Sequence, residues 1–499
     1  MTSDGVAAES SLVIDSVEVD AADSPSILLA GTFVGRLPGE VGFIGARQRL
    51  IAHPVANGPR WSATLPLLAS EWHGPLLPPR SGRYVGTATV DEHTVIPASQ
   101  LLIGVTRITL VREGHTLVAR FASPLLDRER GPLQQAALES DYRSTTYEPL
   151  DAVFFESFFG RNASCNPLAI DRALAEQRPD IRRYWSVADA SVEVPPGAIA
   201  IMEGSAEWWR IRGSARLIVV NDWLRKRYAK RSYQTVLQTW HGTMLKRLAL
   251  SRRRQGVRSA IATLRESRRW NILLAQNPYS RKVFRRAYGY LGQVWEDGYP
   301  RDDVLLTGDP AAVRRRLGVA EGMTVLLYAP TWRDDRPDHV DHLDVARFAE
   351  QLGPGYVTLI RGHSRTLLPG ENVYADRVID VTGYPDISQL FLVADALITD
   401  YSSVMFDFTV TGKPLFFFTP DLEHYRETLR GFYFDLIAIA PGPVVSTLDE
   451  LVALVRTRAE IAPRFAARYA EWRSRFNPKD DGRAAERVVV RLLAEGYIG

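Results

Sequence analysis

The chain has 499 residues, of which 45% are hydrophobic and 24% are charged, and its formal net charge at pH 7 is +3. This length allows two or three domains of about 100–200 residues, each with its own core. The single cysteine, Cys165, excludes an intrachain disulfide and suits a reducing compartment. No apolar run approaches the roughly 18 residues of a membrane-spanning helix. The stretch MTSDGVAAESS has no basic and apolar leader pattern, so we expect no secretory signal.

Residues 1–145 are predicted to form a small β-rich accessory domain. They contain short alternating runs, SLVIDSVEVDA, SILLAGTFVG, RYVGTATV and LLIGVTRITLVREGHTLVARF, separated by glycine, proline and polar turns. Such spacing is typical of a sandwich or barrel. The scattered histidines of this region, His53, His73, His93 and His115, are interpreted as surface or turn residues.

From residue 146 the pattern changes to strands that alternate with helices. The strand-like runs are DAVFFES, YWSVAD, AIAIMEG, ARLIVVND, TVLQTWHG and NILLAQ. Strands alternating with helices favour a parallel, doubly wound sheet. We therefore expect residues 146–315 to form one Rossmann-like lobe.

A second alternating series begins after residue 315. It contains TVLLYAPTW, GYVTLIRGH, VIDVTG, ADALITDYSS and KPLFFFTP, and it is followed by three helical segments that close the chain. Residues 316–499 are thus predicted to form a second Rossmann-like lobe. The expected fold class is α/β, with two such lobes, a cleft between them and the β-rich module in front. This is the plan of two-lobed nucleotide-dependent transferases.

Polar residues follow four of the predicted strands. Ligands of open parallel sheets bind beyond the carboxyl ends of the strands, so these residues are candidates for a binding site. The four groups are His241, Gly242 and Thr243; Pro330 and Thr331; Arg361, Gly362 and His363; and Asp400, Ser402 and Ser403. Four phosphate-compatible strand ends together indicate a phosphorylated ligand.

The segment ITDYSSVMFDFTVTGKPLFFF is the most informative of these. Ser402 and Ser403 are expected to open a helix that ends at Gly412. Serine there can simply cap the helix, but unpaired N–H groups at a helix start also suit a diphosphate. Asp407 lies one turn into the helix, on the face toward the same pocket.

Several other nucleotide and metal motifs are absent or weak. TGKP lacks the upstream glycine and the final Ser/Thr of a Walker loop, and there is no G-x-G-x-x-G for a redox dinucleotide. The stretch DDRPDHVDH, residues 334–342, is interpreted as a charged surface loop and not as a metal site. We therefore expect neither a metal nor a cofactor.

The segment from Trp223 to Trp270 is strongly basic. It holds fourteen Lys and Arg residues and one acidic residue, Glu266. Such a block can attract the phosphates of nucleic acid, of anionic lipid or of a polyanionic product, or it can cover a solvated helix face. Nucleic acid is disfavoured, because Tyr228, Tyr233 and Trp240 lie on predicted core faces and not on an exposed stacking surface.

Together, the motifs VLQTWHGTMLKRLA, GYPRDDVL, LLYAPTWRD, DISQLFLVADALITDYSSVMFDF, KPLFFFTPDLEHYRE and RGFYFDL resemble the CDP-glycerol glycerophosphotransferases of teichoic-acid synthesis. The resemblance covers residues 151–499, with six motifs in the family's order. It implies a GT-B-like fold with CDP-glycerol bound mainly by the C-terminal lobe. It also implies transfer of glycerol phosphate to a hydroxyl of a lipid-linked (polyprenyl-diphosphate) or polyol-phosphate acceptor, with release of CMP.

The resemblance also implies roles for individual residues. His241 would be the general base, because an imidazole can take the proton of a poor hydroxyl nucleophile, and Gly242 would let the acceptor come close. The implied substrate-binding set is Gly242, Thr243, Arg301, Pro330, Thr331, Arg361, His363, Ser402, Ser403 and Asp407. Arg301, Arg361 and His363 are its cationic members. Such an enzyme would act in the cytoplasm of a bacterium, peripherally on the anionic inner face of the membrane.

Two positions depart from the family pattern, and some alternatives stay open. Ser364 replaces the proline of the usual Arg-x-His-Pro, and Met244 replaces the proline after Trp-His-Gly-Thr. Neither change removes a titratable group. A CDP-ribitol transferase or a primase that adds a single unit would carry nearly the same motifs. A sugar-transferring GT-B glycosyltransferase is disfavoured by the paired Trp-His-Gly-Thr and Thr-Asp-Tyr-Ser-Ser motifs.

Overall fold

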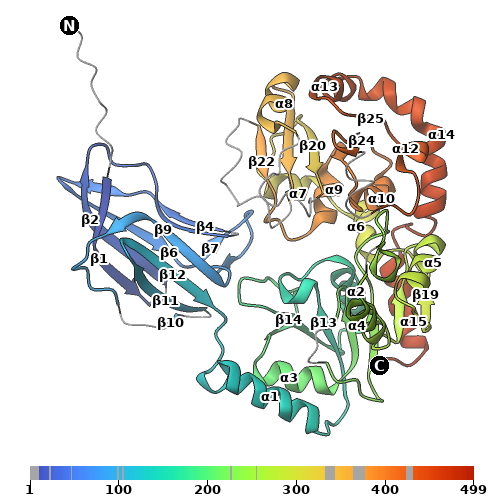
Figure 1. Cartoon of the computed structure of the whole chain (residues 1–499), viewed down its shortest axis with the longest axis horizontal. Coiled ribbons are helices and arrows are strands. Elements are labelled where there is room, and N and C mark those ends of the chain that lie inside the picture. Colours follow the sequence, from blue (N-terminus) through green and yellow to red (C-terminus); the bar gives the residue numbers. More distant parts are fainter. Residues whose placement is uncertain are drawn as a thin grey trace. The chain divides into compact units, whose positions relative to one another are not determined.

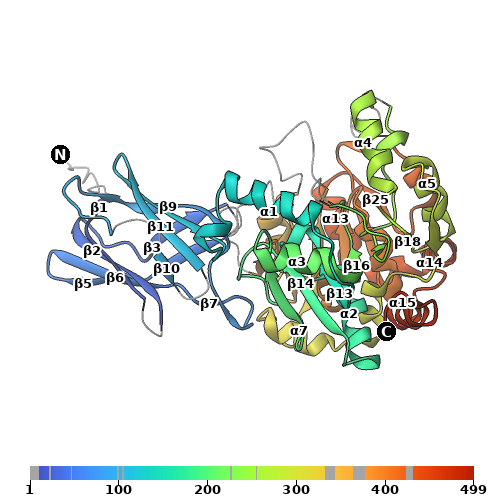
Figure 2. The ribbon, with the colours of Figure 1, turned by 90° about the horizontal axis from the view of Figure 1, so that it is seen from below.

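A computed structural model of the protein describes residues 11–21, 24–46, 48–97, 101–103, 106–224, 228–253, 255–331, 343–362, 377–422 and 431–499. The chain divides into two compact units, drawn in Figures 1 and 2. The first unit takes in the chain through Asp127 and residues 188–193, and the second contains most of the remainder. Within the described ranges, no helix is both long and apolar enough to cross a membrane.

The first unit is built from β-strands. Its main sheet has the order β10-β11-β12-β9-β1-β2-β6-β5, and β3 pairs with both β4 and β9. Side chains of β6 alternate, with Trp61, Ala63 and Leu65 buried and their neighbours exposed, so one face of the strand meets the core. The strands are β1 Ser11–Asp20, β2 Ser26–Val34, β3 Val41–Gly45, β4 Arg49–Ala52, β5 Val55–Asn57, β6 Arg60–Pro66, β7 Ala69–Ser70, β8 Leu76–Leu77, β9 Gly82–Val90, β10 Leu101–Ile103, β11 Thr106–Glu113 and β12 Thr116–Ala122.

The helix α1 (Pro132–Ser144) belongs to the second unit. Its buried Tyr142 contacts Trp209 of α3 (Ala206–Ser214), with ring centroids 4.9 Å apart. The compact first unit therefore ends before this helix, at Asp127, whereas the sequence pattern predicted a boundary at residue 145.

A seven-stranded parallel sheet, here called the first parallel sheet, begins the second unit. Its order is β15-β14-β13-β16-β17-β18-β19. Helices cover both faces, which explains why its strands are almost continuously apolar. The elements are β13 Leu150–Glu156, η2 Phe158–Gly160, α2 Cys165–Gln177, β14 Arg182–Val187, β15 Ile199–Met202, β16 Ala215–Val220, β17 Thr235–Gln238, η3 Ala249–Ser251, α4 Val257–Ser267, β18 Ile272–Leu274, α5 Pro278–Ala287 and β19 Gln293–Trp295.

The second parallel sheet has the order β22-β21-β20-β23-β24-β25. Figure 1 shows it in yellow and orange, with α8 and α13 beside it. Its elements are β20 Thr324–Ala329, α8 Val345–Leu352, β21 Tyr356–Ile360, β22 Val378–Asp380, α9 Ile387–Val393, β23 Ala396–Thr399, α10 Val404–Phe408, η5 Thr409–Thr411, β24 Leu415–Phe418, α12 Leu436–Ile439, β25 Val444–Val445, α13 Leu448–Arg456 and α14 Arg458–Phe476. Along the chain, the strands of the two sheets are separated by η4 Pro300–Asp302, α6 Val304–Thr307 and α7 Pro310–Arg316.

Both parallel sheets are wound in the same way. The chain starts in a central strand, β13 or β20, adds two strands on one side, and returns to the other side with β16 or β23. The crevice outside the carboxyl ends of two such strands is where open α/β sheets bind ligands. Each sheet therefore offers one such point, after β13 and β16 in the first and after β20 and β23 in the second.

The last helix, α15 (Ala484–Ala494), returns from the second sheet to the first. Val488, Val489 and Leu492 are buried in the core that α2 shares with β13 and β14. The start of α15 is held by Asp303, whose carboxylate accepts the backbone N–H groups of Ala484 and Ala485 at 2.9 and 2.7 Å. The C-terminal segment thus fastens the two parallel sheets together.

The predicted α/β class is confirmed, and the strand-like runs named from the sequence form strands in both parallel sheets. The helix expected after Ser403 is present as α10 and η5, and Gly412 ends it with a left-handed φ of 72°. In the parallel sheets two strands were not predicted, β19 and β25, because they have only three and two residues. Runs that short carry no periodicity, and their pairing is decided by the neighbouring strand.

We predict that Leu492→Ala lowers the free energy of unfolding by about 2–5 kcal/mol, because Leu492 is fully buried where α15 meets the first sheet. Val490→Ala on the same helix should cost less than about 1 kcal/mol, since Val490 is 52% exposed. Chemical denaturation of both variants checks this. Equal losses would show that α15 is not seated in that core.

Candidate functional site

His241 lies at the carboxyl edge of the first parallel sheet, three residues after β17. Its Nδ1 is 2.5 Å from the backbone oxygen of Asn221, the residue that follows β16. A carbonyl oxygen can only accept, so Nδ1 must carry the hydrogen. The neutral imidazole then keeps its lone pair on Nε2. The half-buried ring is therefore prepared to take a proton at Nε2 from a bound group.

The ring of His241 is fixed by its surroundings. It stacks on Trp240, with centroids 5.0 Å apart and an interplanar angle of 12°, and Phe158 lies 5.5 Å away on a tilted plane. Trp240 has a left-handed φ of 55°, and the side-chain amide of Asn166 donates to the carbonyls of Thr239 and Trp240 at 3.2 and 3.1 Å. These contacts hold the strained backbone that aims the imidazole.

Gly242 brings the first sheet against the second. A Cβ at this position would lie 3.0 Å from Oγ and 3.2 Å from Cβ of Ser403, and 3.7 Å from Nη2 of Arg301. Only glycine leaves this approach unstrained. His241 is thus next in sequence to a residue that contacts the start of α10. The predicted site residues His241, Gly242 and Ser403 therefore lie close together, although they come from two sheets.

The start of α10 offers two serine hydroxyls. Ser402 and Ser403 are partly exposed, and neither side chain hydrogen-bonds to any residue in the described ranges. Ser403 occupies the N-cap position of α10 without capping it through its side chain. Both hydroxyls can therefore donate to a ligand at this edge of the second sheet.

Neighbouring strand ends of the second sheet are held rigidly beside these serines. The carboxylate of Asp400 accepts the N–H of Thr331 at 2.9 and 3.0 Å and that of Tyr401 at 2.5 Å. This places Pro330 and Thr331, after β20, next to the segment after β23. The backbone around the expected nucleotide position is therefore fixed without a ligand.

Arg361 follows β21, one strand further along the same edge. Its Nη1 donates to the carbonyls of Val381 and Tyr384 at 3.3 and 2.7 Å. Burial lowers the pKa of Arg361 to about 10, which leaves the guanidinium charged at neutral pH. Nε and Nη2 bond to no residue that the structure describes, so they can serve an anion. His363 lies outside the described residues.

Arg301 and Asp407, expected to bind phosphate and a hydroxyl, are paired with each other in the structure. Nη2 of Arg301 donates to Oδ2 of Asp407, Nη1 lies 3.3 Å from the sulfur of Cys165, and both side chains are almost fully buried. Burial raises the pKa of Asp407, and the charge of Arg301 opposes that rise. The pair forms part of the frame on which Gly242 and Ser403 meet.

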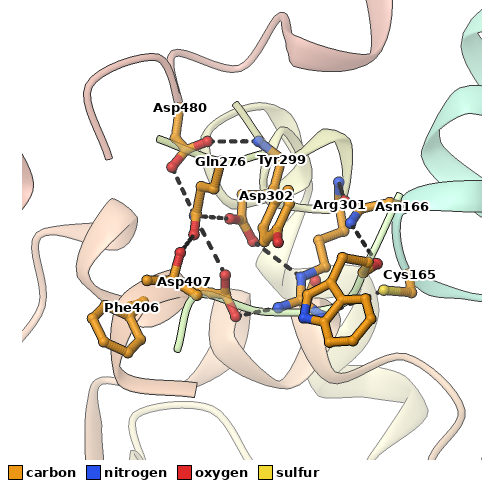
Figure 3. A network of polar contacts seen from close by, with 12 residues as sticks. Cys165, Asn166, Gln276, Tyr299, Arg301, Asp302, Phe406, Asp407 and Asp480 are labelled. Atoms are coloured by element: carbon orange, nitrogen blue, oxygen red, sulfur yellow. Dashed lines mark hydrogen bonds and ion pairs between the residues drawn. The ribbon is translucent and has the colours of Figure 1, made fainter. Parts of the chain in front are cut away.

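A buried polar network extends from this pair (Figure 3). The amide nitrogen of Gln276 contacts the carboxylates of Asp302 at 3.0 Å, Asp480 at 2.9 Å and Asp407 at 3.4 Å. Burial raises the pKa of Asp302 well above its usual value, and raises that of Asp480 to about 7. Repulsion between the acids adds to both shifts, so ionisation of one acid disfavours ionisation of its neighbours.

Thr243 was expected to contact substrate, but its hydroxyl forms hydrogen bonds within the protein. It donates to Oε1 of Gln276 at 2.5 Å, accepts from Nδ2 of Asn277 at 3.0 Å and lies 3.1 Å from Oγ of Ser280. With three partners the hydroxyl is saturated. The side chain of Thr243 therefore anchors the loop that carries His241.

Several residues of the site were not found from the sequence. Gln276 and Asn277 come directly after Ala275 at the end of β18, so the strand-end rule that selected His241 would have selected them too. Asp302 is adjacent to the predicted Arg301. Asp480 gives no sequence signal, because only the return of the C-terminal segment brings it to Gln276.

Comparison with known proteins places this geometry in a family. Residues 142–494 match a family model described as CDP-glycerol:poly(glycerophosphate) glycerophosphotransferase. The match begins inside α1 and excludes the strands of the first unit. All the candidate site residues lie within it.

Two relatives illustrate the likeness. A Bacillus subtilis teichoic acid poly(glycerol phosphate) polymerase is 36% identical over 360 residues, which are 68% of this chain and 48% of that protein. A Staphylococcus aureus teichoic acid glycerol-phosphate transferase is 33% identical over 367 residues, which are 68% of this chain and 92% of that protein. The chain thus spans about half the length of the B. subtilis relative and most of the S. aureus one.

A solved structure of the wall teichoic acid polymerase TagF superposes with a TM-score of 0.67 at 33% identity. It covers 73% of this chain and 94% of its own. Another structure of that polymerase, a variant soaked with CDPG, superposes with a TM-score of 0.66 at 32% identity and covers 72% of this chain and 92% of its own.

Proposed function

Because the chain belongs to the CDP-glycerol:poly(glycerophosphate) glycerophosphotransferase family, we propose that it transfers glycerol phosphate from CDP-glycerol to an acceptor hydroxyl and releases CMP. The product is a teichoic-acid-like polymer, and the acceptor is a lipid-linked or polymeric chain of polyol phosphate. The observation that carries the proposal is the contact of the His241 loop with the start of α10, where a base and two serine hydroxyls meet.

His241 is the proposed general base. The acceptor hydroxyl gives its proton to Nε2 as its oxygen forms a bond to the phosphorus of glycerol phosphate, and the bond from that phosphorus to the CMP oxygen breaks. Nδ1 stays bonded to the carbonyl of Asn221, which stabilises the imidazolium that results. The rest of the catalysis is positioning and charge neutralisation, as in phosphoryl transfer generally.

The second parallel sheet is the proposed donor side. Ser402, Ser403 and Arg361 supply donors for the diphosphate, since their hydroxyls and two guanidinium nitrogens have no partner among the described residues. Pro330 and Thr331 border the nucleotide. The proposed arrangement is a GT-B-like plan, in which residues 146–315 serve the acceptor, residues 316–499 serve the donor, and the N-terminal residues through Asp127 form an accessory module.

The donor assay tests the proposal directly. We expect purified protein with a lipid-linked acceptor to release CMP from CDP-glycerol at least tenfold faster than from CDP-ribitol, which the ribitol-phosphate polymerases among its weaker relatives (28% identical over 240 residues) suggest as the alternative. Chromatographic detection of CMP measures both rates. Faster CMP release from CDP-ribitol would show that CDP-ribitol is the donor. If neither compound released CMP in response to the acceptor, the proposed function would be refuted.

His241→Ala should reduce turnover by about 10²–10⁴-fold, the usual contribution of a general base. Binding of CDP-glycerol should be little changed, because the donor contacts lie on the other sheet. Steady-state kinetics and titration calorimetry measure the two quantities. A variant that has lost donor affinity as well would place His241 in the donor site and not at the acceptor.

We also propose that helix α4 attaches the protein to the anionic inner face of the membrane, where a lipid-linked acceptor resides. Val257 and Ile261, one turn apart, are 76% and 44% exposed. Exposed arginines surround them: Arg252, Arg253, Arg258, Arg265 and Arg268. In Figure 2, α4 stands at the edge of the second unit. A basic helix with a modest apolar face suits a charged membrane surface.

Not every basic residue of this block serves that surface. Arg269 donates to Glu266 at 3.0 Å and to the carbonyl of Leu224 at 2.9 Å, and Arg231 donates to the carbonyls of Ala229 and Tyr142. Glu266, the acidic residue of the block, is buried. These three residues hold the fold together, as does Arg247, which donates to the carbonyl of Phe432.

Replacing Val257 and Ile261 by serine should release the protein from anionic vesicles while leaving CMP release with a soluble acceptor unchanged. Leu133→Ser on α1 is the control, since Leu133 is 82% exposed on another helix. Each basic side chain contributes at most about 1 kcal/mol and is screened by salt, so high salt should also release the wild type. Co-sedimentation unaffected by the double substitution would exclude α4 as the attachment surface.

A further inference from the structure

The side chain of Gln276 contacts both the His241 loop and the donor-side helix α10. Its Oε1 accepts from the hydroxyl of Thr243, two residues after His241. Its Nε2 lies 3.4 Å from Oδ1 of Asp407, four residues after Ser403. The amide therefore spans the two elements that must face each other for transfer.

We propose that Gln276 is a positioning residue for the reaction, which sets the distance between His241 and the donor site without touching substrate. This inference rests on the proposed function. Gln276 acts through Thr243 on one side and through Asp407 on the other.

The orientation of the amide is determined by its neighbours. Three carboxylates surround the nitrogen, and the hydroxyl of Thr243, which accepts from Asn277, has its own hydrogen to give to the oxygen. A flipped amide would place its oxygen against three carboxyl groups, at least one of which would have to be protonated to donate to it. Gln276 thus accepts from Thr243 through its oxygen and donates to Asp302 and Asp480 through its nitrogen.

The other flank of the loop is fixed independently. Asn221 holds the ring of His241, and Asn166 holds the carbonyls of Thr239 and Trp240. Gly242 has no side chain with which to fix its own backbone. The side-chain anchor that follows His241 is thus Thr243, whose hydroxyl contacts Gln276, Asn277 and Ser280. Gln276 is the partner of Thr243 that also reaches Asp407 of α10, so its loss would let the loop shift against Ser403.

Buried surroundings make this bond costly to replace. Gln276, Thr243 and Asp407 are each at most 1% exposed, so water cannot substitute for a lost partner without rearrangement. A displacement of about 1 Å in a catalytic group can cost roughly 10²-fold in rate. The expected signature is therefore a fall in turnover and not in donor affinity.

The primary test is Gln276→Met, which keeps the size of the side chain but removes the amide. We expect kcat to fall about 10- to 100-fold, with KM for CDP-glycerol within about twofold of wild type. Thr243→Val removes the same bond from its other end and should give a similar loss. The double variant should lose less than the product of the two single losses, because one of the contacts that each substitution removes, the bond from Thr243 to Gln276, is shared.

Asn477→Ala is the matched control. Asn477 is buried and donates to Asp480 at 3.0 Å and to the carbonyl of Phe406 at 2.9 Å, so it supports the same acids without reaching Thr243. It should lower the melting temperature while leaving kcat close to wild type. This separates loss of stability from loss of positioning.

The outcomes separate the positioning role of Gln276 from the proposed transferase function. If wild-type protein releases CMP but Gln276→Met and Thr243→Val keep full kcat, the positioning role is wrong while the function stands. Additive losses in the double variant would also overturn it. If Gln276→Met does not fold, Thr243→Val and Asn477→Ala decide by themselves: loss of kcat in the first and not in the second supports the role, and any other pattern refutes it.

Discussion

The ion pair between Arg301 and Asp407 is the interaction on which the candidate site depends. It joins η4, which follows the first parallel sheet, to α10 of the second, and it is almost fully buried. Asp302 and Asp480 lie beside it, and so many carboxyl groups cannot all be ionised next to one guanidinium without a large desolvation cost. Raised pKa values for the acids are the result. The amide of Gln276 makes this crowded arrangement tolerable by donating to the acids.

The geometry of the reaction centre follows from that frame. Gly242 can approach Ser403 closely because Arg301, Asp407 and Gln276 hold the surrounding segments. The carbonyl of Asn221, at the edge of the same sheet, accepts a hydrogen bond from Nδ1 of His241 and so fixes the tautomer of the imidazole. His241 and the serines at the start of α10 thus lie on separate sheets and are held together by buried polar groups.

The N-terminal strands stand outside this scheme. The family match begins at residue 142, and the compact first unit ends at Asp127. Its sheet is antiparallel apart from the parallel pairing of β1 with β9, which contrasts with the two parallel sheets of the second unit. The site residues all belong to the second unit, so the chemistry of transfer can be understood without the first.

The sequence alone determined the α/β class, most strands of the parallel sheets and the polar residues at their ends, because buried parallel strands are continuous apolar runs and the polar residues directly after them mark their carboxyl ends. His241, Ser402 and Ser403 were found in this way. The sequence could not show that Arg301 and Asp407 pair with each other or that the hydroxyl of Thr243 donates to Gln276. Nor could it show that Asp480, in the C-terminal segment, contacts Gln276. Those contacts join residues 33 to 204 positions apart. They form only when two sheets bury polar groups together, which forces each group to find a partner that its own sequence neighbours do not provide.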